Sequence, residues 1–216
     1  MTPRIVPRAE WLIAREELLA KEKAATRAGD ELAALRRALP AVPVEREYVF
    51  EGPDGTAGLL DLFAGRRQLV VYHFMFGPDW AEGCPHCSYL VDHFTHLEHL
   101  HARDTALVVV SRAPWHTIAP FRERMGWTFP WYSTAGNGFG QDFRCDGGDD
   151  EWGGLAVFLR DGDRVLHTYS TTDRGLDRLH NTYNLLDLTP LGRQERADHP
   201  MSWVRHHDRY DLGGGA

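Results

Sequence analysis

The hydrophobic pattern of the chain predicts a long helix followed by alternating strands and helices. Residues 8–39 carry apolar side chains at interrupted helical spacing among Glu, Lys, Arg and Ala, and Pro40 and Pro43 end the segment. The apolar runs at 68–74 and 105–111 have the continuous hydrophobicity of strands that are buried on both faces. The sequence therefore predicts a helical arm that leads into an α/β domain.

Turn residues and periodicity predict the remaining elements. Gly52-Pro53-Asp54-Gly55 is strong turn chemistry between short extended pieces, and Asp161-Gly162 is the turn of a hairpin. Apolar residues at helical spacing predict further helices, and apolar runs predict further strands. The helices are expected at 85–101, 114–126 and 176–186, and the strands at 129–132, 155–159 and 164–170.

The predicted order is organised as one domain with two extensions. Residues 1–43 form the helical arm, 44–190 the α/β domain, and 191–216 a polar C-terminal tail whose last residues, Gly213 to Ala216, we expect to be disordered. The arm packs either on its own domain or on a partner subunit. The second interpretation predicts a homodimer through the N-terminal helix.

Composition and charge narrow the classes of function. The 216 residues are 43% hydrophobic and include three cysteines, which supports a real core and excludes a disulfide scaffold. A formal net charge of −7 argues against nucleic-acid binding and against docking on anionic lipid. No apolar stretch approaches the length of a membrane span, and the first residues lack the apolar core of a signal peptide, so we expect a cytoplasmic protein.

Cys84-Pro85-His86-Cys87 stands between a predicted strand and a predicted helix. A thiol at a helix start lies among unpaired N–H groups at the positive end of the helix dipole, which lowers its pKa. Cys84 is therefore the expected nucleophile, and Cys87, one turn further in, the expected resolving cysteine. Pro85 suits the first helical turn, and protonated His86 would add positive charge beside the thiolate.

The order strand, helix, strand, helix, hairpin, helix, with Cys-x-x-Cys at the first strand–helix junction, is the thioredoxin arrangement. The predicted fold class is therefore α/β and thioredoxin-like: a central mixed sheet flanked by helices, with a long N-terminal helical extension. Phe74 to Trp80 followed by Gly83-Cys84-Pro85-x-Cys87 resembles an uncharacterised bacterial thioredoxin-like family, a domain of unknown function. Further matches, such as Phe129-Pro130-Trp131, extend the resemblance over nearly the whole chain. The resemblance implies the fold and no established substrate.

Two departures from related redox proteins are visible. Thioredoxins carry a cis-proline just before the hairpin strand, where this chain has Trp152-Gly153-Gly154. Peroxiredoxins place Thr or Ser three residues before the peroxidatic cysteine, where this chain has Ala81. The first departure questions thioredoxin-like docking of substrates, and the second speaks against a peroxidase.

Five residues are expected to support or modulate the cysteine pair. Trp80 either shields the thiolate or packs in the core, and His73 lies near the strand end where open α/β sheets bind ligands. Asp79 and Glu82 would raise the pKa of the thiol if they lay close to it. Cys145, in the glycine-rich loop, is either a plain thiol or an extra redox partner of Cys84.

The expected function is thiol–disulfide exchange without a cofactor, with a protein or small-molecule thiol or disulfide as partner. One alternative is a cysteine-based hydroperoxide reductase. Another is a non-enzymatic binding or structural protein on a thioredoxin scaffold. A zinc site made by the three cysteines and one histidine is a further alternative, and His93, His96 and His99 at three-residue spacing are either a polar helix face or a metal face.

Overall fold

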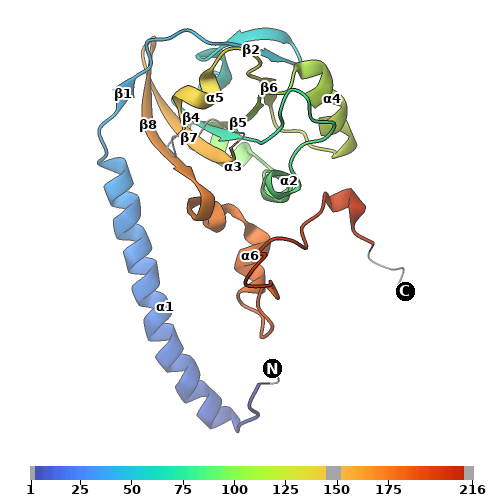
Figure 1. The fold of residues 1–216 in the computed structure, drawn as a ribbon. Helices are drawn as coiled ribbons and strands as arrows, with labels where there is room; N and C mark the ends of the chain where they lie inside the picture. Colours follow the sequence, from blue (N-terminus) through green and yellow to red (C-terminus); the bar gives the residue numbers. More distant parts are fainter. Residues whose placement is uncertain (1–2, 145–151, 212–216) are drawn as a thin grey trace.

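The computed structural model describes residues 3–144 and 152–211 of the chain (Figure 1). The strands are β1 (Val42–Pro43), β2 (Val49–Gly52), β3 (Gly55–Gly58), β4 (Gln68–His73), β5 (Thr105–Ser111), β6 (Trp131–Ser133), β7 (Gly154–Asp161) and β8 (Arg164–Thr172). The α-helices are α1 (Arg8–Arg37), α2 (Pro85–Val91), α3 (Glu98–His101), α4 (Trp115–Arg124), α5 (Phe139–Asp142) and α6 (Asn181–Leu186). Short 3₁₀ helices are η1 (Asp61–Phe63), η2 (Asp173–Leu179) and η3 (His207–Arg209).

The strands form one mixed sheet in the order β1-β8-β7-β4-β5-β6-β2-β3. The central strand β4 pairs in parallel with β5 and antiparallel with β7, so that Tyr72 lies between Val109 and Leu155. The hairpin β7–β8 extends the sheet on one side of β4, and β1 pairs with β8 at the edge. Parallel β4 and β5, joined through α2 and α3 and flanked by an antiparallel hairpin, confirm the predicted thioredoxin-like fold.

Each face of the sheet carries its own hydrophobic cluster, because successive side chains of a strand point to opposite faces. Tyr72 belongs to the cluster that includes residues of α2 and α4. Val71 belongs to the other cluster, with Phe139 of α5 and Phe63 of η1. The continuous hydrophobicity of 68–74 is thus explained by burial on both faces.

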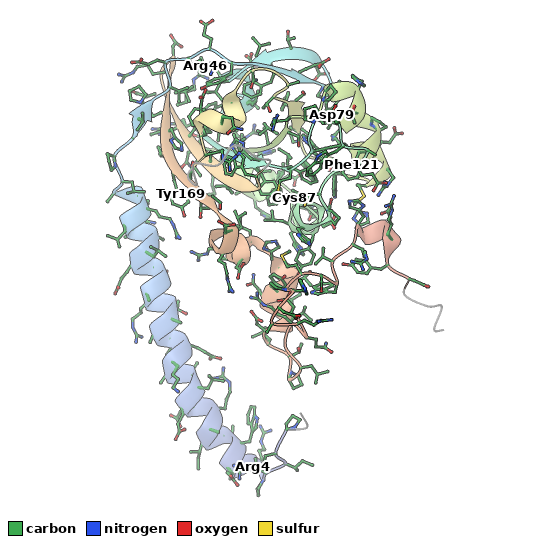
Figure 2. The ribbon with its side chains drawn as sticks, viewed as in Figure 1. Arg4, Arg46, Asp79, Cys87, Phe121 and Tyr169 are labelled. Atoms are coloured by element: carbon green, nitrogen blue, oxygen red, sulfur yellow. The ribbon has the colours of Figure 1, made fainter. Side chains whose placement is uncertain are left out.

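The N-terminal helix α1 is formed as predicted, but none of its residues is buried (Figure 1). Its apolar side chains are solvent-exposed, for example Trp11 at 51% and Leu35 at 67%. Figure 2 shows side chains projecting into open space along the length of the helix, from Arg4 near its start. The interpretation that the arm packs on its own domain is therefore wrong.

The single helix predicted over 85–101 is also wrong, because the segment contains two helices, α2 and α3, with an irregular stretch between them. The side chain of Asp92 accepts hydrogen bonds from Trp127 Nε1 at 2.8 Å and from the ring of His207 at 2.8 Å. His96 has a left-handed backbone with φ of 58°. These tertiary contacts and the left-handed residue interrupt a helical pattern that the apolar spacing alone supports.

The last predicted helix, 176–186, is likewise divided into η2 and α6. His180 separates them with an extended ψ of 87°, and its Nδ1 contacts the carbonyl of Leu176 at 3.2 Å. Its ring stacks on Tyr89 of α2 with ring centroids 5.2 Å apart. Packing against α2 therefore replaces helix continuity at this position.

The segment from 191 to 211, hereafter the C-terminal segment, folds back toward α2, as the red chain in Figure 1 shows. Val204 is buried in a cluster with Tyr89 of α2 and Tyr183 of α6. His206 is buried and its Nε2 lies 2.9 Å from the carbonyl oxygen of Gly83, just before the cysteine pair. The segment thus contacts the element that carries the candidate site.

Candidate active site

The cysteine pair lies at the junction of β4 and α2. Cys84 is the N-cap residue of α2, with an extended ψ of 129°, and Pro85 occupies the first helical turn. The N–H of Cys84 donates to the carbonyl of Met75 at 2.9 Å, and the hydroxyl of Ser88 donates to the carbonyl of Cys84 at 2.9 Å. These bonds hold the start of the helix, so the first thiol lies where the sequence predicts it.

The environment of Cys84 favours its thiolate. Its pKa is lowered from 9.0 to about 6, first by a hydrogen bond from the Cys87 thiol and then by the backbone N–H groups of Cys87 and His86 and the charge of His86. Burial opposes this shift. Asp79 and Glu82 are not among these causes. The free N–H groups of a helix start and a neighbouring thiol donor therefore decide the protonation of Cys84.

Cys87 is the more buried thiol, at 3% exposed against 9% for Cys84. Burial is the first cause that raises the pKa of Cys87 well above its ordinary value. The N–H of Met75 donates to its Sγ at 3.5 Å, and the hydroxyl of Tyr72 also donates to it. One thiolate and one protonated thiol at adjacent positions are the arrangement that stepwise disulfide exchange requires.

Tyr72 is a site residue that the Cys-x-x-Cys motif does not predict. Burial raises the pKa of its phenol well above the ordinary value, so the hydroxyl stays protonated near neutral pH and can donate a hydrogen bond. Its ring packs edge-on against Phe74 and Phe94, which fixes the direction of the hydroxyl. A phenol within a buried, mainly apolar strand is the signal in the sequence, because a buried hydroxyl needs a hydrogen-bond partner.

Gly153 and Gly154 occupy the place where thioredoxins have their proline. A Cβ at Gly153 would lie 3.3 Å from Cys87 Sγ and 3.7 Å from the Tyr72 hydroxyl, so glycine permits a close approach of the backbone to the thiol. A Cβ at Gly154 would overlap the ring of Trp152 at 1.8 Å. Among the described residues there is no cis peptide bond. Gly153 therefore lets the backbone just before β7 approach Cys87, and Gly154 leaves room for the Trp152 ring.

His73 and Trp80 take different positions relative to the thiols. His73 is buried between Phe139 and Trp152, with ring centroids 5.6 Å and 4.5 Å away, and burial lowers its pKa to about 3. Its Nε2 has no hydrogen-bond partner among the described residues. Trp80 is 40% exposed and its indole lies over Gly77, where a Cβ would meet it at 2.8 Å. Trp152, which the His73 ring stacks on, borders the same cavity as Cys87.

Asp79 and Glu82, which would raise the pKa of the thiol if they lay close to it, have other surroundings. Asp79 is exposed (Figure 2). Glu82 forms ion pairs with Arg124 at 3.3 Å and with Arg209 of the C-terminal segment. A hydrogen bond from Arg209 is the first cause that lowers the pKa of Glu82. Glu82 therefore ties the C-terminal segment to the start of α2.

A cavity of about 520 Å³ opens beside the cysteine pair. Tyr72, Met75, His86, Cys87 and Leu90 contribute one wall. The opposite walls come from Trp152 and Gly153, from η2 and α6, and from the C-terminal segment. The cavity has the volume of a small-molecule site.

The part of the chain that the structure describes offers no support for a metal site. There, no group of three or more His, Cys, Asp or Glu side chains could hold a metal ion. Of the predicted histidine row, His93 has Nε2 at 3.2 Å from the hydroxyl of Thr182, and His96 lies in the irregular stretch after α2. Cys145 lies outside the described residues, so its redox role and the zinc alternative stay predictions. In the residues described, no helix is both long and apolar enough to span a membrane.

Nearly the whole chain matches one protein family. A family described as "Bacterial protein of unknown function (DUF899)" matches residues 1–210. The chain belongs to this family. The match covers the arm, the domain and nearly all of the C-terminal segment, so these three parts occur together in the family. No protein with curated annotation is detectably similar in sequence.

Solved structures with similar folds share little sequence with this family member. A putative protein disulfide isomerase from Bacteroides thetaiotaomicron is 17% identical, with a TM-score of 0.44, and the alignment covers 68% of this chain and 91% of that one. Peroxidoxin BcpB from Mycobacterium tuberculosis is 21% identical, with a TM-score of 0.44 and coverage of 68% and 97%. A DsbF homologue from Corynebacterium diphtheriae is 17% identical, with a TM-score of 0.41 and coverage of 66% and 87%.

Proposed function

We propose that this protein is a thiol–disulfide oxidoreductase in which Cys84 is the nucleophile and Cys87 the resolving cysteine. The observation that carries the proposal is the placement of Cys84 at the N-cap of α2, with Cys87 one turn further into the helix. The partner is a protein or small-molecule thiol or disulfide, and no cofactor takes part.

The exchange proceeds in two balanced steps. The Cys84 thiolate attacks one sulfur of a disulfide, a Cys84–substrate disulfide forms, and the other substrate sulfur leaves as a thiolate that takes a proton from water. Cys87 then loses its proton and attacks Cys84 Sγ, which forms the Cys84–Cys87 bond and releases the second substrate thiol. The dithiol of the protein is oxidised and the substrate is reduced. Both steps are reversible.

Tyr72 is the residue positioned to assist the second step. Its hydroxyl donates to Cys87, so it stabilises the Cys87 thiolate at the moment when that sulfur attacks or leaves. The carbonyl of Met75 and the N–H of the same residue hold Cys84 and Cys87 at either side of this short network. Tyr72 is therefore a positioning residue in the proposal.

The reduction potential of the pair tests the proposal. Metal-free protein equilibrated in glutathione buffers should show one two-electron transition between about −120 and −270 mV, the range of known oxidoreductases. Cys84→Ser and Cys87→Ser should each abolish the transition, whereas Ser88→Ala should keep it. The proposal would be contradicted if both thiols stayed free at every ratio of reduced to oxidised glutathione. Zinc that co-purifies with the protein would strengthen that contradiction.

Hydroperoxide reduction is not part of the proposal, because Ala81 stands where peroxidases need a hydroxyl. Loss of peroxide that depends on Cys84 in a coupled assay would restore it. The homodimer through α1 stays a prediction. A solution mass that shows only monomer at micromolar concentration would remove it.

A further inference from the structure

The cavity beside the cysteine pair is built by two parts of the chain that are far apart in sequence. One wall belongs to β4 and α2, and the other includes Leu176, Tyr183, Pro200 and Met201. Its volume of about 520 Å³ is in the range of pockets that enclose one small molecule, roughly 300–1,000 Å³. The C-terminal segment therefore makes a concave site where the bare domain would present an open surface.

The charged groups of the cavity wall already have protein partners. Arg174 pairs with Asp177 at 2.7 Å, and Arg193 pairs with Asp187 at 2.7 Å while stacking over the Tyr183 ring. A charged ligand would have to compete with these pairs for its own partner, and it would lose its hydration in doing so.

The other charged side chains on that wall are also engaged. Asp173 accepts from the Thr172 hydroxyl at 2.6 Å, and the Arg144 guanidinium lies 5.6 Å from the ring centroid of Trp152. Glu195 is occupied as well. One of its oxygens accepts from the Tyr183 hydroxyl at 2.7 Å, from the Met201 N–H at 3.0 Å and from Trp203 Nε1 at 3.2 Å. Besides the exposed His86 ring, the wall offers a ligand apolar surface, from Met75, Leu90 and the residues named above. The wall therefore favours an uncharged, mainly apolar ligand.

Of the two cysteines, Cys87 borders this cavity. Cys84 and Cys87 are only 9% and 3% exposed, and His86 and Cys87 are cavity-lining residues while Cys84 is not. A ligand body held in the cavity thus lies against Cys87 and His86, and its sulfur end has to extend beyond these lining residues to meet Cys84. A slender molecule fits this path better than the surface of a folded protein.

We propose that the cavity binds the body of small, uncharged, mainly apolar dithiols and disulfides, which are the substrate class of the cysteine pair. This inference rests on the proposed function. With an oxidised protein, one thiolate of the ligand attacks Cys84, the Cys84–Cys87 bond breaks, and Cys87 leaves and takes a proton. The second ligand thiol loses its proton and attacks the ligand sulfur bound to Cys84. A cyclic disulfide then forms, Cys84 is released, and the ligand's two electrons have reduced the protein.

The first test compares two dithiols that differ only in charge. Dihydrolipoamide and dihydrolipoate carry the same two thiols, and the second ends in a carboxylate. The reference for each dithiol is the rate at which it reduces free oxidised glutathione. After division by this reference rate, dihydrolipoamide at limiting concentration should reduce the Cys84–Cys87 disulfide about tenfold faster than dihydrolipoate. Reduced, unfolded ribonuclease serves as the protein dithiol and should react more slowly per thiol than dihydrolipoamide. Equal rates for the two small dithiols, or a faster protein dithiol, would overturn the inference.

The second test changes the cavity without touching the thiols. Pro200 is exposed at the cavity wall, so Pro200→Trp should narrow it and raise KM for dihydrolipoamide about fivefold. Leu191→Trp is the control, because Leu191 is exposed on the same segment and does not line the cavity. Met201→Ala enlarges the cavity from within and should also raise KM. Unchanged KM in both cavity variants would overturn the inference.

A third measurement separates this inference from the proposed function. Equilibrium dialysis of the Cys84→Ser/Cys87→Ser protein with oxidised lipoamide reports binding without exchange. Lipoamide binding that is retained in this protein, and that becomes weaker when Pro200→Trp is added to it, supports the cavity as the ligand site even if the redox proposal fails. A normal glutathione transition in the native protein, with no lipoamide binding, leaves the redox function standing and removes the cavity as its substrate site.

Discussion

The two ends of the chain differ in how they are stabilised. Helix α1 is thirty residues of regular structure with no buried side chain. The C-terminal segment has little regular structure, yet Val204 and His206 are buried against the helix that carries the cysteines. Regular hydrogen bonding and tertiary packing are therefore separate contributions here, and only the packed end touches the candidate site.

The difference follows from where each end finds its partners. The arm satisfies most of its backbone groups internally, so its hydrogen bonds do not depend on distant residues. The C-terminal segment depends on distant groups, such as Glu82 for Arg209 and Gly83 for His206. Isolated helices are only marginally stable in water, which makes the exposed apolar stripe of α1 the more notable feature.

The largest expected effect places the same substitution in both ends. Val204→Asp would bury a charge among Tyr89 and Tyr183 and should lower the free energy of unfolding by about 3–5 kcal/mol. Leu18→Asp, at an exposed position of α1, should change it by less than about 1 kcal/mol. Denaturant titration of both proteins measures the contrast. Similar losses at the two sites would mean that the arm is packed in solution.

The second effect concerns the contact between the C-terminal segment and the cysteine junction. His206 Nε2 donates to the Gly83 carbonyl and its Nδ1 accepts from Arg124 at 3.2 Å, so His206→Ala leaves a buried carbonyl unpaired. The loss in the free energy of unfolding should be about 2 kcal/mol. His207→Ala, at a half-exposed neighbour paired with Asp92, should cost less than about 1 kcal/mol. An equal cost for both histidines would contradict the role given to burial.

The third prediction distinguishes control of the Cys84 pKa by α2 from control by the C-terminal segment. The rate of alkylation by iodoacetamide should rise with pH through a midpoint near 6, where the pKa of Cys84 lies. Cys87→Ala removes the first cause of that lowered pKa, so the midpoint should move up by about one pH unit or more. His206→Ala should leave the midpoint unchanged. A shift in His206→Ala alone would transfer control to the C-terminal segment.

The same titration has a consequence for stability with a definite sign. Folding lowers the pKa of Cys84 from 9.0 to about 6, so the thiolate stabilises the folded state fully above pH 9. That contribution is lost as the pH falls through about 6. The free energy of unfolding of Cys87→Ala should therefore vary less with pH between about 6 and 9 than that of the native protein.

The smallest effect tests the contact that joins the arm to the domain. The guanidinium of Arg36 lies 5.4 Å from the ring centroid of Tyr169 on β8. Arg36→Ala should lower the free energy of unfolding by about 0.5 kcal/mol, as expected for an exposed cation–π pair. Arg37→Ala, at the adjacent exposed position, should have no measurable effect. A loss above about 2 kcal/mol in Arg36→Ala would show that the arm is held far more firmly than this contact allows.

The sequence was informative wherever local chemistry decides the structure. Pro40 after a helix-favouring segment marked the end of α1 to within a few residues, and the apolar run before Cys84 marked β4. The Cys-x-x-Cys spacing placed one thiol at the helix start and the other one turn inside. Each of these results depends on neighbours a few residues away, and such neighbours are readable in the sequence.

Tertiary structure decided the features that depend on distant partners. The bonds from Trp127 and His207 to Asp92 accompany the end of α2, and stacking of His180 on Tyr89 divides the last helix. Hydrophobic periodicity carries no record of such contacts. The segment after residue 190 looked polar for the same reason, because its few buried residues show no period.

The sequence by itself determined the arm, the thioredoxin-like order of elements and the identity of the two thiols. Only the tertiary structure decided that Tyr72 donates to Cys87, that Gly153 approaches the same sulfur, and that the C-terminal segment walls a cavity beside them. The physical reason is that helix starts and strands form from near neighbours, whereas the site is completed by residues from other elements, which lie far from Cys87 in the sequence, as Gly153 and Met201 do.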